Sequence, residues 1–118
     1  MKTKFLGNTL SGPFTIPSGI VTTATSIIQA MFDHMPQIGV ITTKSVGPTP
    51  RTGNREPVYS QYAPGCFVNA VGLTNPGAEA SAQAMKQLRI PEDRFLLVSI
   101  FGVSIEEFVE VAKIMAHV

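Results

Sequence analysis

The chain has 118 residues, of which 44% are hydrophobic and only 14% are charged, and its formal net charge is +1. This length fits at most one domain, yet it is long enough to bury a core. The apolar excess is typical of parallel strands buried on both faces, or of a piece whose apolar surface is covered by something else. Because there is no basic run or stripe, nucleic-acid binding has no electrostatic basis.

Location and metal binding can be judged from a few positions. Residues 1–5 lack the apolar core of a signal peptide, and no apolar run is long enough to span a membrane. Cys66 is the only cysteine, so no disulfide can form within the chain. We therefore expect a cytoplasmic protein that does not bind a membrane. His34 and His117 each lack a second metal-type ligand nearby, so we expect no metal site.

Apolar residues at strand and helix spacing divide the chain up to residue 43 into alternating elements. The helix expected over residues 25–35 has Thr25 or Ser26 as its candidate N-cap and is followed by Pro36. The strand expected over residues 38–43 is rich in β-branched residues and almost uncharged, which is typical of a buried parallel strand. The expected elements are, in order, a hairpin over 4–10 around a Gly-Asn turn, a strand over 14–17, a helix over 25–35 and a strand over 38–43.

A long loop over residues 45–75, rich in Pro, Gly and Asn, follows the strand expected over residues 38–43. A loop of that length in a compact domain is usually functional or disordered, and its apolar residues, such as Tyr59 and Phe67, favour an ordered one. The elements expected in and after it are a ribbon at 58–61 and 66–69, a helix from Pro76 to about Leu88, a strand over 95–100 and a helix opened by a capping box at 104–107.

Repeated strand–helix units with nearly continuous apolar strands predict an α/β fold with a parallel sheet. A doubly wound open sheet is one candidate, but no Gly-x-Gly-x-x-Gly fingerprint follows the first strand. Polar clusters instead follow the ends of successive strands, at Ser18-Gly19, Lys44-Ser45 and Gly102, as in barrel active sites. A whole barrel needs roughly 250 residues. We therefore expect residues 1–118 to be the N-terminal part of a (β/α)8 TIM barrel, about three βα units preceded by a small β-hairpin.

Lys44 comes directly after the uncharged strand expected over residues 38–43. A surface lysine that extends its charged end into solvent would explain this position equally well. The hydroxyl of Ser45 and the long loop behind it favour a binding site, in which the cation pairs with a carboxylate or an electron-rich ring.

Asn69 stands out from the asparagines and glycines that follow it. Such residues mostly serve turn geometry, and Asn75-Pro76-Gly77 is interpreted as a helix start. Asn69 instead follows the apolar pair Phe67-Val68. Because an amide can donate and accept at once, this position suits a planar heterocycle with imide edges. Arg51 is expected to be a structural clamp on the loop.

Three motifs occur in a specific order and spacing. They are Ile16-Pro17-Ser18-Gly19, then Thr42-Thr43-Lys44-Ser45 with Pro50-Arg51-x-Gly53-Asn54-x-x-Pro57, and Asn69-Ala70-Val71-Gly72-Leu73-x-Asn75-Pro76-Gly77. On these motifs nearly the whole chain resembles the class 1 dihydroorotate dehydrogenases, the flavin enzymes of pyrimidine biosynthesis. Val58 departs from the pattern, because relatives usually carry an arginine there.

The resemblance implies a barrel that holds FMN at its mouth and oxidises dihydroorotate to orotate. The positions that would line the cofactor are Ser18, Gly19, Lys44 and Ser45. The positions that would contact the substrate are Lys44, Asn69, Val71, Gly72 and Leu73. Lys44 is the expected catalytic residue of this part, because its charge can stabilise electron density arriving at the flavin ring. The family's base is a cysteine on a later loop, past residue 118, and Cys66 does not match it.

Partners follow from the same resemblance. It implies dihydroorotate or orotate as ligand and a homo-oligomer or hetero-oligomer. Sequence detail is nearer the heteromeric NAD-linked subclass, whose partner is an electron-transfer subunit with FAD and an iron–sulfur cluster. The alternatives are another FMN barrel, such as a dihydropyrimidine dehydrogenase, or a non-catalytic truncated barrel piece. We expect residues 1–118 alone to be inactive, since the later phosphate-binding loops and the base are not among them.

Overall fold

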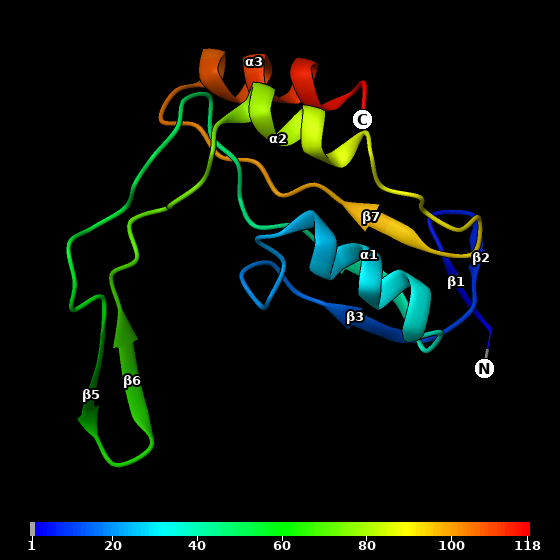
Figure 1. Cartoon of the computed structure of the whole chain (residues 1–118), viewed down its shortest axis with the longest axis horizontal. Coiled ribbons are helices and arrows are strands. Elements are labelled where there is room, and N and C mark those ends of the chain that lie inside the picture. The colour runs from blue at the N-terminus through cyan, green and yellow to red at the C-terminus, as the bar shows by residue number, and fades with distance from the viewer. Residues whose placement is uncertain (1) are drawn as a thin grey trace.

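The computed structural model describes residues 2–118 (Figure 1). It opens with an antiparallel hairpin of β1 (Thr3–Phe5) and β2 (Asn8–Leu10). The following elements are, in chain order, β3 (Phe14–Ile16), α1 (Thr25–His34), β4 (Ile38–Thr42), β5 (Tyr59–Ala63), β6 (Cys66–Asn69), α2 (Ala78–Met85), β7 (Phe95–Leu97) and α3 (Ile105–Met115). This order confirms the predicted alternation of strands and helices, with the predicted ribbon inside the long loop.

A parallel sheet with the strand order β3-β4-β7 forms the centre of the fold. Ile41 of β4 lies opposite Ile16 of β3 on one side and opposite Leu96 of β7 on the other. Residues 38–41 are buried, as expected for the middle strand of such a sheet. The α/β class and the parallel sheet are therefore confirmed. The closed barrel stays a prediction, because β3 and β7 are edge strands within residues 2–118.

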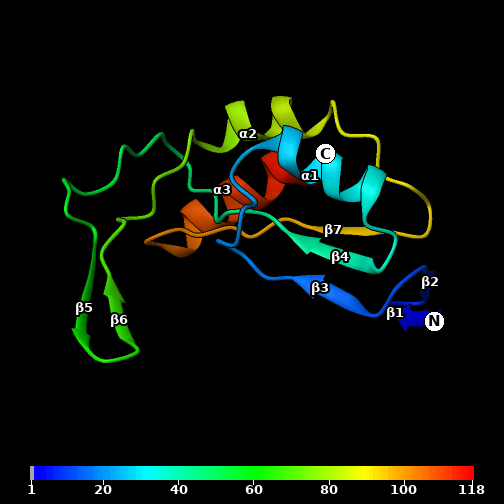
Figure 2. The same cartoon turned by 60° about the horizontal axis from the view of Figure 1, so that its bottom comes forward.

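Helix α1 packs on the sheet, and Figure 2 shows α1 and α2 on the same side of it. Ile28, Met31 and Phe32 recur at helical spacing and form one apolar stripe on α1. This stripe packs with Ile38 and Ile41 of β4 in one buried cluster. The amphipathic pattern in the sequence thus decides which side of α1 faces the strands.

Helices α2 and α3 pack against each other and form a second buried cluster. Ala78, Ala82 and Met85 of α2 meet Val111 and Met115 of α3. The small residues of α2 allow this close approach. Among residues 2–118, none of the helices has the length and hydrophobicity needed to cross a bilayer.

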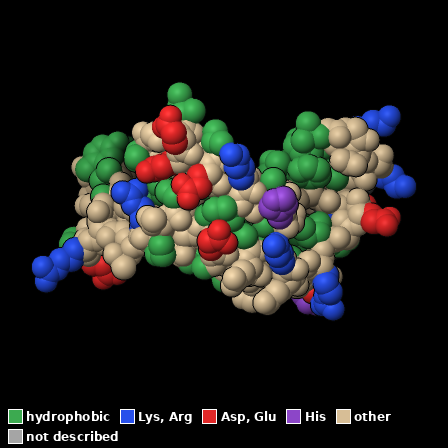
Figure 3. All heavy atoms as spheres, turned by 90° about the horizontal axis from the view of Figure 1, so that it is seen from above, with side chains coloured by type: hydrophobic (Ala, Val, Ile, Leu, Met, Phe, Trp, Pro, Cys, Tyr) green, Lys and Arg blue, Asp and Glu red, His purple; other side chains and the backbone are tan. Residues whose placement is uncertain are grey.

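Apolar side chains also remain on the surface formed by α3 and α2. Figure 3 shows this face from above, with hydrophobic side chains standing beside acidic ones. Ile105 at the start of α3 is 78% exposed, and Phe108 and Val109 are each almost half exposed. Part of the apolar excess of the composition is thus buried, as in β4, and part lies on exposed surfaces such as this one.

The hairpin at the start of the chain packs beside the amino ends of the sheet strands. Its turn residues are Leu6 and Gly7, with φ of 45° and 81°, so the predicted Gly-Asn turn is wrong by one residue. Positive φ at both positions is the geometry that matches the twist of two short strands. The Phe5 ring meets the Phe95 ring edge-on with centroids 5.3 Å apart, and Ser11 N donates to Asp93 O at 3.0 Å.

Two helix starts differ from the prediction. The N-cap of α1 is Ala24, with extended φ and ψ of −101° and 130° and no side-chain hydrogen bond, so neither Thr25 nor Ser26 is the cap. Helix α2 begins after Gly77 rather than at Pro76, because φ of 86° at Gly77 is not helical. At its other end α2 stops at Met85, three residues short of the predicted end.

Helix α3 begins with the predicted cap. The Ser104 hydroxyl accepts a hydrogen bond from Glu107 N at 3.3 Å. The Glu107 carboxylate reaches back to accept from Val103 N at 2.8 Å, one residue before the cap. A backbone hydrogen bond at Glu106, and then the Ser104 hydroxyl, lower the pKa of the exposed Glu106 carboxyl below its ordinary value.

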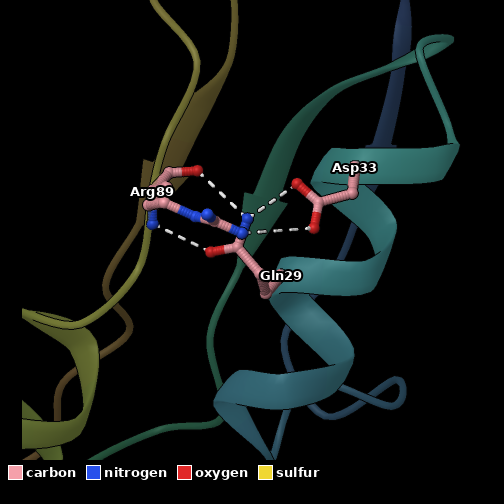
Figure 4. Close-up of polar contacts among 3 residues, drawn as sticks. All are labelled: Gln29, Asp33 and Arg89. Carbon is pink, nitrogen blue, oxygen red and sulfur yellow. Dashed lines mark hydrogen bonds and ion pairs between the residues drawn. The ribbon is translucent and has the colours of Figure 1, made fainter.

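A polar contact joins α1 to the loop after α2 (Figure 4). The Gln29 side chain donates to Arg89 O at 3.2 Å and accepts from Arg89 N at 2.8 Å. Gln29 also donates to the Asp33 carboxylate at 2.9 Å, and that carboxylate lies 4.0 Å from the Arg89 guanidinium. Because the Arg89 side chain is 84% exposed, the ion pair adds little, and the two backbone contacts of Gln29 make the connection.

Arg94, directly before β7, ties that strand to the end of α1. Its Nη1 donates to Met35 O at 3.0 Å and to Ile38 O at 2.9 Å. Its side chain is only 7% exposed, and Nε lies 3.5 Å from the Asp93 carboxylate. Since the last carbonyls of a helix lack partners within the helix, this arginine supplies one to the C-cap residue Met35.

Replacing Arg94 and Arg89 one at a time separates the contribution of the Arg94 hydrogen bonds to stability from that of the exposed Arg89 ion pair. Arg94→Met should lower the free energy of unfolding by about 2 kcal/mol, because it removes two hydrogen bonds made by a charged side chain that is only 7% exposed. Arg89→Met should lower it by no more than about 0.5 kcal/mol, because only an exposed ion pair is lost. Urea unfolding of both variants beside the wild type measures the difference. Equal losses would show that the Arg94 hydrogen bonds do not hold β7 to α1.

Candidate ligand site at the ends of the parallel strands

Three serine hydroxyls meet at the carboxyl end of the sheet. Ser18, Ser45 and Ser99 follow β3, β4 and β7 respectively. Ser45 Oγ lies 2.8 Å from Ser99 Oγ and 3.4 Å from Ser18 Oγ, so the first contact is a good hydrogen bond and the second is long. Residues from three distant parts of the sequence thus become neighbours, because parallel strands end at one edge of the sheet.

The segment after β4 stays hydrogen-bonded to the segment after β7. Thr43 N donates to Leu97 O at 2.9 Å, and Val46 N donates to Ser99 O at 2.9 Å. Between these contacts, the fully buried Thr43 hydroxyl accepts from Ser99 N at 3.1 Å. A side chain therefore replaces a backbone carbonyl as the acceptor, and β7 ends at Leu97 rather than at the predicted Ile100.

Lys44 is half-buried and is held between these hydrogen-bonded positions. Its backbone N–H donates to Thr22 O at 3.1 Å, which ties it to the loop after β3. The ion pairs within residues 2–118 join Arg89 to Asp33 and Arg94 to Asp93, so no carboxylate there neutralises Lys44. Its positive charge is available to an anionic or electron-rich ligand.

Gly19 turns the chain away from β3 directly after Ser18. Its φ is +85°, which L side chains rarely adopt. Nothing lies within 4 Å of the position that a Cβ would occupy, so the surface beside Ser18 is open. A glycine is needed here for the turn rather than for close packing.

Asn69 lies apart from this group of residues. It ends β6, is exposed, and its backbone lies opposite Tyr59 of β5. Figures 1 and 2 show the β5–β6 ribbon standing away from the sheet, so residues 2–118 do not bring Asn69 to the serine cluster. The ribbon is ordered, as predicted, and the Tyr59 and Phe67 rings stack on it with centroids 5.2 Å apart.

The segment that joins the ribbon to α2 has an unusual backbone. Gly72 and Leu73 both have positive φ, at 82° and 56°, and this is uncommon for leucine. Asn54 holds the preceding residues, since Asn54 Nδ2 donates to Ala70 O at 2.8 Å and Asn54 N donates to Val71 O at 3.0 Å. Non-glycine residues held in this conformation cluster at active sites and ligand-binding sites, although a tight turn can also require it.

Arg51 closes the base of the long loop over residues 45–75. It exchanges two backbone hydrogen bonds with Asn75, at 2.9 and 3.0 Å. Its guanidinium carbon lies 5.7 Å from the centroid of the Phe101 ring, within cation–π distance. These contacts agree with the predicted role of Arg51 as a structural clamp.

The sequence did not reveal the roles of Asn75 and Ser99. Asn75 is 6% exposed; its Oδ1 accepts from Gly47 N at 3.2 Å and Gly77 N at 2.9 Å, and its Nδ2 donates to Leu73 O at 2.7 Å. It therefore joins three backbone segments beside the site. The only sequence signal for Ser99 is its place as a polar residue at the end of an apolar strand.

The two asparagines should respond oppositely to truncation. Asn75→Ala should lower the free energy of unfolding by about 3 kcal/mol, because it leaves buried backbone groups without partners. Asn69→Ala should leave it nearly unchanged, because that side chain is exposed. Urea unfolding of the matched pair tests this, and a small loss for Asn75→Ala would contradict its scaffold role.

Within the described part of the chain, no group of three or more His, Cys, Asp or Glu side chains is arranged to hold a metal ion. The groups available to a ligand at the strand ends are hydroxyls, backbone amides and one lysine side chain. Parallel βα units that gather such groups at their carboxyl ends define an α/β protein with a candidate ligand site at one edge of its sheet.

Comparison with known proteins narrows this class. The family model for dihydroorotate dehydrogenase matches residues 1–118, and the chain belongs to that family. It is 33% identical over 118 residues to a Methanocaldococcus jannaschii protein named dihydroorotate dehydrogenase B (NAD(+)), catalytic subunit, with 98% of this chain and 38% of that protein aligned.

Two further relatives show the same pattern. A Methanosarcina mazei protein with the same name is 33% identical over 108 residues, which cover 91% of this chain and 33% of that protein. A Trypanosoma brucei brucei protein named dihydroorotate dehydrogenase (fumarate) is 31% identical over all of this chain and 37% of its own length. The chain therefore spans well under half the length of the curated relatives it matches.

Proposed function

We propose that these residues belong to a flavin-dependent enzyme that oxidises dihydroorotate to orotate in de novo pyrimidine biosynthesis. The observation that carries the proposal is the gathering of Ser18, Lys44 and Ser45 at one edge of a parallel sheet, in a chain whose whole length matches the family. We further propose that residues 1–118 form about three βα units of a single FMN-binding (β/α)8 barrel domain. The relatives' names support dihydroorotate over a dihydropyrimidine as substrate.

The chemistry of the donors at the strand ends fits the polar edge of an FMN ring. A flavin ring presents carbonyl oxygens and ring nitrogens, while serine hydroxyls donate or accept and lysine donates. The proposed FMN-lining residues are Ser18, Gly19, Lys44 and Ser45. Ser99 holds the Ser45 hydroxyl in place, and the open surface beside Gly19 leaves room for a planar group.

Lys44 is the proposed catalytic residue of this part of the enzyme. FMN, when bound, supplies the two-electron acceptor for the oxidation. Lys44 places a positive charge at the strand ends, where negative charge develops. Because the backbone on both sides of Lys44 is hydrogen-bonded, the point from which its side chain extends is fixed before the reaction begins.

The proposed substrate contacts come from two separate segments. They are Lys44, Asn69, Val71, Gly72 and Leu73. The exposed Asn69 amide can donate and accept, which suits the imide edge of a pyrimidine. The strained backbone at Leu73 supports a binding role for this run. Since Asn69 and Lys44 lie apart, their shared role is best tested through ligand binding.

We also propose a partner, an electron-transfer subunit that carries FAD and an iron–sulfur cluster. The words "catalytic subunit" in the names of the archaeal relatives support it. A second candidate is direct reduction of fumarate, for which the Trypanosoma brucei brucei relative is named. Supplying NAD+ with the partner subunit, or fumarate without it, distinguishes these acceptors.

Substituting Lys44 tests the catalytic assignment. In the FMN-loaded protein at its natural length, Lys44→Ala should slow flavin reduction by dihydroorotate about 10²–10³-fold, the usual effect of removing a preorganised charge or donor. Stopped-flow absorbance follows this half-reaction, and Lys86→Ala on the exposed end of α2 is the matched control. An unchanged reductive rate in Lys44→Ala would remove this residue from the site.

Substituting Asn69 tests the substrate assignment. Asn69→Ala should weaken orotate binding by about 1–3 kcal/mol, because a polar edge of the ligand is left unpaired. FMN content should stay the same, and Asn8→Ala on the opening hairpin should affect neither. Calorimetric titration with orotate measures the change. Loss of FMN together with normal orotate binding would reverse the assignment.

A further inference from the structure

Two loop segments between β4 and α2 lie side by side, residues 51–54 and 70–75. At one end of this pairing, Arg51 exchanges two backbone hydrogen bonds with Asn75. At the other end, Asn54 N donates to Val71 O at 3.0 Å. The second segment contains the proposed substrate contacts of the loop, so their position depends on the first segment.

Asn54 reaches the second segment with its side chain as well as with its backbone. Asn54 Nδ2 donates to Ala70 O at 2.8 Å, which is a good hydrogen-bond distance. The two donors of Asn54 thus hold the peptide groups on both sides of Val71. Because Asn54 is exposed, this contact adds little to the buried core. Asn54 is not among the proposed cofactor or substrate contacts.

The turn that Asn54 holds has a conformation that needs support. Gly72 and Leu73 have φ of 82° and 56°. A leucine persists in this conformation only where its surroundings fix it. The fit at the turn is close, because a Cβ at Gly72 would lie 2.8 Å from Asn54 N and 2.9 Å from Asn54 Cγ. The backbone of the turn therefore packs directly against Asn54.

Gly53 allows the same close approach one residue earlier. A Cβ at Gly53 would overlap the Thr74 hydroxyl oxygen and Val71 O. The Thr74 hydroxyl also donates to Thr52 O at 3.1 Å. A larger residue at position 53 would therefore push the two segments apart beside the turn.

We propose that Asn54 is a positioning residue for substrate binding, which acts through the turn at residues 71–73. This role rests on the proposed function, in which the turn contacts the pyrimidine. Asn54 does not touch the ligand, and its two hydrogen bonds orient the peptide groups on both sides of Val71 before the ligand arrives. Preorganised binding groups lose less freedom when a complex forms, so the affinity for the ligand depends on this contact.

Calorimetric titration of the FMN-loaded protein at its natural length with orotate tests this role. Asn54→Leu keeps the approximate size of the side chain and removes its donor, so the Kd for orotate should rise about fivefold. FMN content and urea unfolding should stay unchanged, because Asn54 is exposed. Gly53→Ala, which separates the segments, should raise the Kd at least as much. Asn8→Ala is the matched control, since the exposed Asn8 amide also donates to a backbone carbonyl, that of Leu6.

Stopped-flow flavin reduction distinguishes positioning from a part in the chemistry. In Asn54→Leu the dihydroorotate concentration that gives half the maximal rate should rise about fivefold, while the maximal rate should change less than about twofold, because Lys44 is not moved. A fall in the maximal rate with an unchanged half-saturating concentration would contradict a positioning role.

Two further outcomes would overturn the positioning role alone. In one, orotate binds wild type and Asn54→Leu equally well; in the other, Asn54→Leu lowers the free energy of unfolding without changing the Kd. If Gly53→Ala does not fold, Asn54→Leu decides the question by itself. Failure of wild type to bind orotate would instead overturn the proposed function, and this role with it.

Discussion

The hydrogen bonds that continue from β4 to the segment after β7 are the constraint on which the candidate site depends. Thr43 and Val46 each donate to the neighbouring segment, and Lys44 and Ser45 lie between these two contacts. The Thr43 side chain supplies the acceptor that the backbone lacks at Ser99. Lys44 and Ser45 are therefore positioned by the sheet itself, although they lie beyond the last residue of β4.

Asn75 has a comparable role for the loops. Its amide group contacts the segment after β4, the turn at Leu73 and the start of α2. Burying an amide is unfavourable unless its donors and acceptor are satisfied, and here both ends have partners. The site is thus supported by one buried side chain in the loops and by the sheet ladder below it.

Much of the architecture was predictable because it depends on local patterns. The apolar stripe containing Ile28 and Phe32 identified α1, and the uncharged run at 38–43 identified β4. The order and spacing of three motifs, one of them around Lys44, identified the family. Local patterns also misled, because Ala24 caps α1 without a side-chain oxygen and Leu6 takes a turn position that sequence rules give to Gly or Asn. The contact between Ser45 and Ser99 was not predictable, since it depends on the register of strands far apart in sequence.

The backbone hydrogen bonds between Arg51 and Asn75 have a consequence for how this protein can change. They close the base of the long loop, so β5 and β6 extend from a fixed point and pair with each other rather than with the sheet. Insertions, deletions or new side chains in the ribbon leave the register of β3, β4 and β7 untouched. Apart from Asn69, the surface that the ribbon presents to other molecules can therefore diversify while Lys44 and its neighbours stay in place.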